Sequence, residues 1–295
     1  MKSMQLINRS IKIPFQSFRS QSFSSSSKST SSSVSENEVS KFSNMAASWW
    51  ELDNNPLITM NPVRMKFIEE TLRSNNKILN YPLLDITKYD PLKGLKALDV
   101  GCGGGLLSES LARLGADVTA IDPSAEVADA AHEHSRLDPC TRQIEYRGGI
   151  SVEEMASEYA KENNQGLFDI VCVLEVIEHA SDPQSLIRNA ASLLKKPTSD
   201  NCTGGMLFIS TINRTAKSYA LAIVGGEFVM RKLPVGTHSW MKFKSPQEVH
   251  SLIRDCGLSQ IDVNGMVLSP PFFNMRWKLD PEDVDINWIG AYSHN

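Results

Sequence analysis

The sequence has few cysteines, few aromatic residues and no long apolar run. The five cysteines among its 295 residues are scattered and include no Cys-x-x-Cys pair, so we predict neither a zinc site nor a disulfide framework. No stretch reaches the roughly 20 uninterrupted apolar residues that a membrane-spanning helix needs. Hydrophobic residues still make up 41% of the chain, which is enough to fill the core of one large domain with extensions.

Acidic residues are absent from the first 33 positions, and Glu36 is the first one in the chain. These positions hold thirteen serines and five basic residues, with apolar residues interspersed among the bases as in an amphipathic presequence. We therefore predict a mitochondrial transit peptide over residues 1–33, because a disordered serine-rich tail would not explain the missing acids. Its removal changes the formal charge from −4 to −9, which makes nucleic acid an unfavourable partner.

One glycine of a dinucleotide-binding loop is also missing. An apolar run over 95–100 leads into a glycine-rich turn, 101–105, and Leu106 stands where the Gly-x-Gly-x-x-Gly pattern has its third glycine. This difference disfavours a dehydrogenase. A helical pattern over 106–114 and a second apolar run that ends in Asp122 follow the turn. In an open α/β sheet, an adenosine-containing ligand binds at such a succession of strand, turn, helix and strand.

The spacing of the remaining glycines fits S-adenosylmethionine, which carries no phosphate and needs no helix N-terminus reserved for an anion. Gly101 and Gly103 lack a Cβ and are expected to leave room for its methionine half. Asp122 is placed to accept hydrogen bonds from both ribose hydroxyls. The alternative is an ordinary glycine turn, with Asp122 as a turn residue, but the two features occur together at the required spacing. The loop resembles the nucleotide-binding motif of class I S-adenosylmethionine-dependent methyltransferases.

Strands and helices alternate along the rest of the chain. We predict strands at 95–100, 118–121, 144–146, 168–174, 205–211, 258–263 and 285–292. Helices are predicted at 106–114, 125–135, 152–161, 184–195 and 246–256, and within 36–80, where Asn61-Pro62 is expected to start a second helix. The pattern predicts an α/β fold, in which a helical N-terminal cap over 34–92 precedes a Rossmann-like class I methyltransferase domain over 93–295. Its sheet is expected to be seven-stranded, mostly parallel and flanked by helices.

Two acids and a histidine follow the strand predicted at 168–174. If this segment turns helically, Glu175, Glu178 and His179 share one face and can hold a divalent cation. Oxygen ligands suit magnesium, whereas the histidine suits manganese, iron or zinc better. The alternative is a solvated helix start, where the helix dipole favours acids in any case.

These residues, behind Phe168-Asp-Ile-Val171, resemble the ubiquinone-biosynthesis O-methyltransferase family. Matching stretches extend from about Glu38 to the C-terminus, namely 47–52 (Ala-Ser-Trp-Trp-Glu-Leu), 61–64 (Asn-Pro-Val-Arg), 98–105, 182–185, 211–214, 236–238 (Gly-Thr-His) and 283–287. The glycine loop alone would be generic, but the Ser-Trp-Trp, Asn-Pro-x-Arg and Gly-Thr-His stretches in this order are specific.

The resemblance implies O-methylation of polyprenylated catechol intermediates at two steps of ubiquinone assembly, with 3-demethylubiquinol and polyprenyl-dihydroxybenzoate or -hydroxyphenol type substrates. The cofactor contacts that it implies are Arg64, which suits the methionine carboxylate, Gly101, Asp122 and Leu174. The metal ligands that it implies, with Mg²⁺ as the expected ion, are Glu175, Glu178 and His179. It further implies a mitochondrial protein, peripheral on the matrix side of the inner membrane, and a place in a multi-enzyme ubiquinone biosynthesis complex.

Two mechanisms are open for activation of the phenol, and we expect the one that uses a chelated metal. A phenol with a pKa near ~10 is mostly protonated at neutral pH, and the phenolate is the better nucleophile. A metal chelated by both catechol oxygens would lower that pKa and fix the oxygen that faces the methyl group. Alternatively, His179 would act as a general base without any metal.

Residues 213–240 are predicted to form a lid or membrane-facing insertion. Within it, 217–233 mixes apolar residues with basic ones, as expected of an interfacial helix that lies on a membrane and admits the polyprenyl tail. A lid helix packed on the core is equally compatible with the pattern. The competing functions are methylation of another small phenol, which needs no metal triad, and a non-catalytic cofactor-binding scaffold in a biosynthetic complex.

Overall fold

The computed structural model describes residues 33–46, 49–51, 55–75, 90–162, 167–197, 204–220, 240–270 and 275–294. All of them belong to one compact unit, Ser31–Asn295. The predicted transit peptide lies outside the described residues except for Ser33, and so does most of the predicted insertion at 213–240. No helix within the described ranges combines the length and the apolarity needed to cross a bilayer.

The described strands form a single eight-stranded sheet in the order β3-β2-β1-β4-β5-β8-β6-β7. Strands β1 to β5 pair in parallel, whereas β8, β6 and β7 continue the sheet in antiparallel fashion. Their bounds are β1 Lys96–Val100, β2 Asp117–Asp122, β3 Glu145–Gly148, β4 Ile170–Leu174, β5 Met206–Ile212, β6 Leu258–Ser269, β7 Arg276–Asp280 and β8 Asn287–His294.

The predicted α/β fold is confirmed, but the predicted number of seven strands is wrong. The additional strand, β7, lies at the end of the sheet and pairs with β6 alone. It has five residues, of which none is buried. A short strand that alternates charged and apolar residues and contributes little to the core carries a weak sequence signal.

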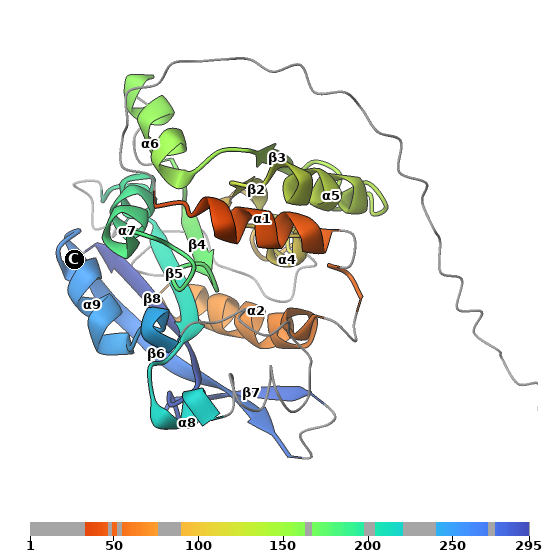
Figure 1. Ribbon diagram of the computed structural model, residues 1–295. Helices are drawn as coiled ribbons and strands as arrows, with labels where there is room; N and C mark the ends of the chain where they lie inside the picture. The colour runs from red at the N-terminus through yellow and green to blue at the C-terminus, as the bar shows by residue number, and fades with distance from the viewer. Residues whose placement is uncertain are drawn as a thin grey trace, which may run out of the picture. The chain divides into compact units, whose positions relative to one another are not determined.

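Helices cover both faces of the sheet (Figure 1). Their bounds are α1 Glu36–Met45, α2 Pro56–Ser74, α4 Leu106–Arg113, α5 Ala125–Ser135, α6 Val152–Lys161, α7 Pro183–Ser192, α8 Ala216–Ser218 and α9 Pro246–Arg254. One apolar cluster joins α2 and α4 to one face, and a second joins α6, α7 and α9 to the other. Neighbouring β1 residues alternate between them, Ala97 in the first and Leu98 in the second. The central parallel strands are consequently buried on both faces.

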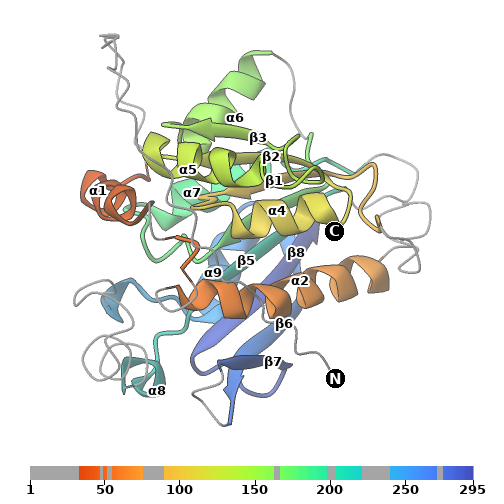
Figure 2. The ribbon, with the colours of Figure 1, turned by 90° about the vertical axis from the view of Figure 1, so that its right-hand side faces the viewer.

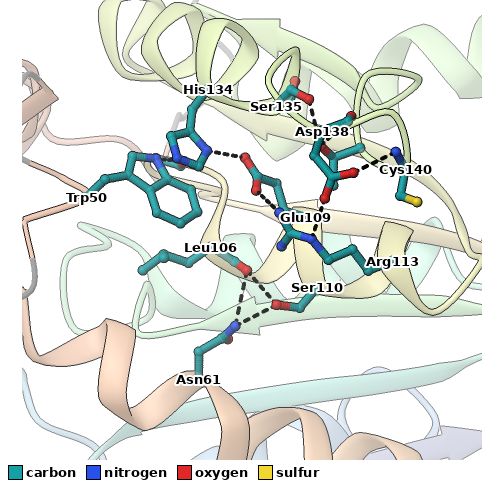
Figure 3. Close-up of polar contacts among 12 residues, drawn as sticks. Trp50, Asn61, Leu106, Glu109, Ser110, Arg113, His134, Ser135, Asp138 and Cys140 are labelled. Carbon is teal, nitrogen blue, oxygen red and sulfur yellow. Dashed lines mark hydrogen bonds and ion pairs between the residues drawn. The ribbon is translucent and has the colours of Figure 1, made fainter. Parts of the chain in front are cut away.

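The second N-terminal helix starts earlier than the sequence predicts. Asn55 is its N-cap, with Oδ1 accepting a hydrogen bond from Leu57 N at 3.0 Å, and Pro56 occupies the first turn. Pro62 therefore lies inside α2, and the predicted start at Asn61 is wrong. The Asn61 side chain instead ties α2 to α4, donating to Leu106 O at 3.1 Å and to the Ser110 hydroxyl at 2.9 Å (Figure 3).

Candidate active site

The candidate site lies at the carboxyl ends of the central strands. Sheet order reverses between β1 and β4, because β2 and β3 extend to one side of β1 while β4 and β5 extend to the other. In open α/β sheets, ligands bind outside the carboxyl ends of the strands at this switch point. The glycine loop follows β1, Asp122 ends β2 and Glu175 follows β4, so the topology brings these groups to one edge. Helix α1 also lies at this edge, as Figure 2 shows.

The glycine loop adopts the predicted tight turn between β1 and α4. Gly101, Gly103 and Gly105 have φ values of 70°, 53° and 85°, in the left-handed region that glycine enters without a steric penalty. The backbone N–H groups of Gly101 and Cys102 donate to Ile121 O at 2.8 and 3.0 Å, which fastens the loop to β2.

The space above the glycines is filled by neighbouring side chains. A Cβ at Gly101 would lie 2.6 Å from Val176 Cγ2, and a Cβ at Gly103 or Gly104 would overlap the indole ring of Trp49. At the position of a Cβ, Gly101 and Gly103 thus leave room for Val176 and Trp49.

A second tryptophan anchors the same segment to the loop. Trp50 Nε1 donates to Gly104 O at 3.0 Å, and its ring stacks on His134 with 3.5 Å between the centroids and 7° between the planes. His134 Nδ1 lies 2.6 Å from Oε1 of the fully buried Glu109, which also pairs with Arg113 (Figure 3). This network joins residues 49–51 to α4 and α5.

Asp122 is held by backbone donors on both of its oxygens. Oδ2 accepts from Gly103 N at 3.0 Å and Oδ1 from Ser124 N at 2.8 Å. Asp122 is 9% exposed, and this burial raises the pKa of its carboxyl group above the usual value. Each carboxylate oxygen has a further lone pair, so the group can also accept hydrogen bonds from two hydroxyls. The neighbouring Asp99 in β1 accepts from the Ser108 hydroxyl at 2.6 Å, and burial raises the Asp99 pKa to about 6.

Arg64 reaches the site from α2, where it is only 3% exposed. Its Nη2 lies 3.2 Å from Glu175 Oε1, but neither Nη2 nor Nε has a hydrogen-bond partner among the described residues. A buried guanidinium in this state is suited to a carboxylate ligand, which it binds through two parallel N–H donors. Leu174, the last residue of β4, is buried in the apolar cluster of α2 and α4, so its side chain is a packing group.

Glu175, Glu178 and His179 do not lie on a helix, so the condition under which they would share one helical face is not met. The segment forms turns, in which His179 N donates to Val176 O at 2.9 Å. Glu175 adopts a φ of 58°, which is uncommon for a residue with a side chain. The turn removes the common helical face on which a shared metal site was expected.

Each of these three side chains has a partner of its own. Glu175 Oε1 accepts from the Ser210 hydroxyl at 2.6 Å, and Glu178 Oε2 accepts from the Thr211 hydroxyl at 2.8 Å. Burial, reinforced by the negative charge of Glu175, raises the pKa of Glu178 to about 7. The described residues contain no group of three or more His, Cys, Asp and Glu side chains arranged to hold a metal ion.

His179 is paired with an acid that the sequence analysis did not select. Its Nδ1 lies 3.0 Å from Glu38 Oε2, and this hydrogen bond lowers the Glu38 pKa to about 2. Glu38 lies in the first turn of α1, where an acid is already explained by the helix dipole. Ser210 and Thr211 were also missed, although two hydroxyl residues in an otherwise apolar strand are a signal that could have identified them.

Comparison with known proteins gives consistent results. A family model described as a methyltransferase domain matches residues 70–262. A ubiquinone biosynthesis O-methyltransferase from Cereibacter sphaeroides is 40% identical over 257 residues, which cover 86% of this chain and 94% of that protein. Another from Xanthomonas euvesicatoria is 42% identical over 237 residues, covering 80% of this chain and 85% of that protein.

Solved structures share the fold at low sequence identity. The magnesium protoporphyrin IX methyltransferase ChlM from Synechocystis, with bound SAH, has a TM-score of 0.52 and 19% identity, covering 80% of this chain and 84% of that one. The N-methyltransferase NodS from Bradyrhizobium japonicum, in complex with S-adenosyl-L-homocysteine, has a TM-score of 0.51 and 16% identity, covering 88% and 99%.

Proposed function

Because the chain belongs to the ubiquinone biosynthesis O-methyltransferase family, we propose that it methylates a phenolic oxygen of polyprenylated catechol intermediates. The chain is an S-adenosylmethionine-dependent O-methyltransferase. The proposed acceptors are of the 3-demethylubiquinol and the polyprenyl-dihydroxybenzoate or -hydroxyphenol types. The observation that carries the proposal is the buried, incompletely paired Arg64 guanidinium, which reaches the sheet edge where β2 ends in Asp122.

The residues at this edge fit S-adenosylmethionine. Arg64 has donors for the methionine carboxylate, and Asp122 has acceptor capacity for the ribose hydroxyls. When bound, S-adenosylmethionine supplies an electrophilic methyl group on a sulfonium sulfur. Two contacts at separate points of one ligand fix its orientation, and in-line transfer depends mainly on such positioning.

His179 is the residue that we assign to the phenolic proton. It follows β4 at the same edge, and its side chain is 15% exposed. Because Nδ1 faces Glu38, the proton is taken up at Nε2. The phenolic hydrogen moves to Nε2 as the oxygen–carbon bond forms and the sulfur–carbon bond breaks, which leaves a neutral thioether and an imidazolium ring next to the Glu38 carboxylate.

The predicted Mg²⁺ ligands, Glu175, Glu178 and His179, do not fit a metal in the arrangement described, so no step is assigned to one. A chelator experiment separates the two mechanisms. Turnover that persists in EDTA supports proton uptake by His179. Turnover that is lost in EDTA and restored by Mg²⁺ supports chelation of the catechol.

Substrate class is tested by comparing two acceptors. The full chain is incubated with S-adenosylmethionine and either a short-chain prenyl catechol or catechol itself, and kcat/KM is measured for each. The proposal expects a clear preference for the prenyl compound. Equal kcat/KM values would favour methylation of another small phenol, and S-adenosylmethionine binding without transfer to either acceptor would favour the scaffold function.

We also propose a mitochondrial location, peripheral on the matrix side of the inner membrane, and membership of a ubiquinone biosynthesis complex. The support is the acid-free, serine-rich composition of residues 1–33 and the pathway in the relatives' names. Import of a reporter that carries residues 1–33 tests the location. Flotation with liposomes, compared between the full chain and a variant lacking 217–233, tests the membrane contact.

A further inference from the structure

Ser33, the first residue that the structure describes, is buried, with 3% of its surface exposed. Its backbone N–H donates to Oε1 of Glu153 at 3.2 Å, and its carbonyl oxygen accepts from Ser181 N at 2.8 Å. Glu153 lies in the first turn of α6, and Ser181 lies between β4 and α7. Figure 1 shows the start of α1 beside α6 and α7. The body of the domain therefore holds both backbone groups of Ser33.

Glu153 is a buried carboxylate whose hydrogen bonding is incomplete. The residue is 9% exposed, and its Oε1 accepts from two neutral donors, the Ser33 N–H and the Ser185 hydroxyl at 3.0 Å. Oε2 is buried and has no hydrogen-bond partner among the described residues. Protonation of the carboxyl group would not satisfy this oxygen, because the new O–H would itself need an acceptor. Buried carboxylates are normally paired with a cation, and the described contacts of Glu153 include none.

The N-terminus of α6 does not complete these contacts. Ser151 and Glu154 form the capping box of the helix, so the cap does not involve the Glu153 side chain. The helix dipole favours a negative charge in the first turn, but it supplies no hydrogen to Oε2. Glu153 is thus stabilised as an anion and still lacks one donor within the described part of the chain.

The nitrogen of Ser33 is within reach of Glu153 and can become that donor. In the uncut chain it is an amide with one hydrogen, which Oε1 already accepts. Hydrolysis of the Ser32–Ser33 peptide bond by a processing peptidase joins the oxygen of water to the Ser32 carbonyl carbon as the carbon–nitrogen bond breaks. The released nitrogen takes up protons from water. An α-amino group has a pKa near ~8, so Ser33 then carries an ammonium group at pH 7, with three N–H donors.

We propose that Glu153 binds the α-ammonium group of Ser33, and that the mature chain begins at this residue. The ammonium keeps the contact with Oε1 and provides a donor for Oε2. The cut lies one residue before the end predicted for the transit peptide, and only its origin rests on the proposed mitochondrial location. The ammonium site does not depend on the methylation reaction. Because Ser33 precedes Ser35, the N-cap of α1, by two residues, the ion pair fixes the chain where α1 begins.

Two chain starts and two residues at position 153 form a double-mutant cycle. Chains that begin at Ser33 or Ser31, each released from an N-terminal fusion partner, place the ammonium group at Glu153 or two residues before it. Both include every described residue and the whole compact unit. We expect Glu153→Gln to lower Tm by about 3–10 °C more in the chain from Ser33. The full chain, in which the Ser33 nitrogen is an amide, should respond like the chain from Ser31. Glu158→Gln is the matched control, since this exposed acid of α6 should affect all three chains equally.

Acetylation of the terminal amine provides a second readout and needs no substitution. Native chains from Ser33 and Ser31 are treated with an acetylating reagent at pH 7, and mass spectrometry follows the N-terminal peptide. The Ser33 amine should react about 10-fold more slowly, because a buried, ion-paired ammonium is a poor nucleophile. Glu153→Gln should remove most of this protection.

Import of the full chain into isolated mitochondria tests the position of the cut. Mass spectrometry of the recovered protein should identify an N-terminal peptide that begins with Ser33. A mature chain that begins elsewhere, or one that keeps residues 1–32 after import, overturns the inference. Equal effects of Glu153→Gln on Tm in the two chain starts, or equal acetylation rates, also overturn it. If the full chain is not imported but the cycle and the acetylation rates show the coupling, the proposed location fails and the ammonium site stands.

Discussion

Replacing Arg64 by lysine is expected to weaken S-adenosylmethionine binding while leaving the fold intact. Lysine keeps a positive charge near Glu175, which lies 3.2 Å from Arg64 Nη2 in the wild-type structure. It replaces the planar fork of donors by a single ammonium group, so one of the two parallel hydrogen bonds to a carboxylate is lost.

The size of the effect follows from the burial of the pair. A hydrogen bond to a charged group contributes about 1.5–3 kcal/mol, so loss of one such bond corresponds to a rise in Kd of about 10- to 100-fold. Removal of the charge is more severe for the fold. In Arg64→Leu, the Glu175 carboxylate keeps Ser210 but loses its cation, and breaking a buried ion pair costs about 3–5 kcal/mol.

Calorimetric titration with S-adenosylmethionine and urea unfolding measure the two effects separately. The double variant Arg64→Leu/Glu175→Gln should recover much of the stability lost in Arg64→Leu without recovering S-adenosylmethionine binding. Arg73→Lys, at an exposed position of the same helix, is the matched control and should change neither quantity. A wild-type Kd in Arg64→Lys, or restored binding in the double variant, would refute the assignment of Arg64 to the methionine carboxylate.

Two further predictions concern the strand and the loop beneath the site. Because the Asp99 pKa is raised to about 6 from 3.8, the native state holds this proton more tightly than the unfolded chain, so its contribution to stability falls as pH rises from about 4 to 6. Urea titrations should therefore show that the free energy of unfolding of Asp99→Asn rises relative to that of the wild type as pH increases across this window. A difference between the two proteins that does not change with pH would contradict the burial argument. Gly257→Ala, where φ is 74° and the Cβ would meet nothing within 4 Å, should cost about 1–2 kcal/mol from backbone strain alone. Gly103→Ala should cost more and alter tryptophan fluorescence because the new methyl group meets Trp49, and equal costs at the two positions would show that Trp49 does not sit on the loop.

The parts of the fold that the sequence predicted well are specified locally. The Ser245 capping box and Pro246 start α9 where expected, and Asp182 with Pro183 starts α7. The glycine loop has positive φ at three alternate positions, and each of them is occupied by a glycine, so its conformation can be read from its own residues. Local signals cannot predict where a helix starts when the same signal occurs twice. Asn55-Pro56 and Asn61-Pro62 both have the pattern of a helix N-terminus, and the helix starts at the first of them. The Asn61 side chain instead contacts α4.

The sequence places the residues of the candidate site at strand ends but does not reveal their hydrogen-bond partners. Glu175, Glu178 and His179 follow β4 as expected, yet their hydrogen-bond partners are Ser210, Thr211 and Glu38, which are 33 to 141 positions away in the sequence. Such distant contacts leave no periodic pattern. Residues close in the sequence therefore suggested a helical turn. In the folded chain, the backbone of Glu175 instead lies in the left-handed region, and the three side chains have different partners.

Product analysis of one reaction tests the central claim most directly. The full chain is incubated with S-adenosylmethionine carrying a ¹³C-labelled methyl group and a short-chain prenyl catechol, and the products are analysed by mass spectrometry and NMR. Asp122→Ala, which removes the acceptor for the ribose hydroxyls, serves as the inactive control. The account predicts S-adenosylhomocysteine and a catechol labelled on one phenolic oxygen, both absent with the control. A label on carbon, or unlabelled catechol despite measurable S-adenosylmethionine binding, would contradict it.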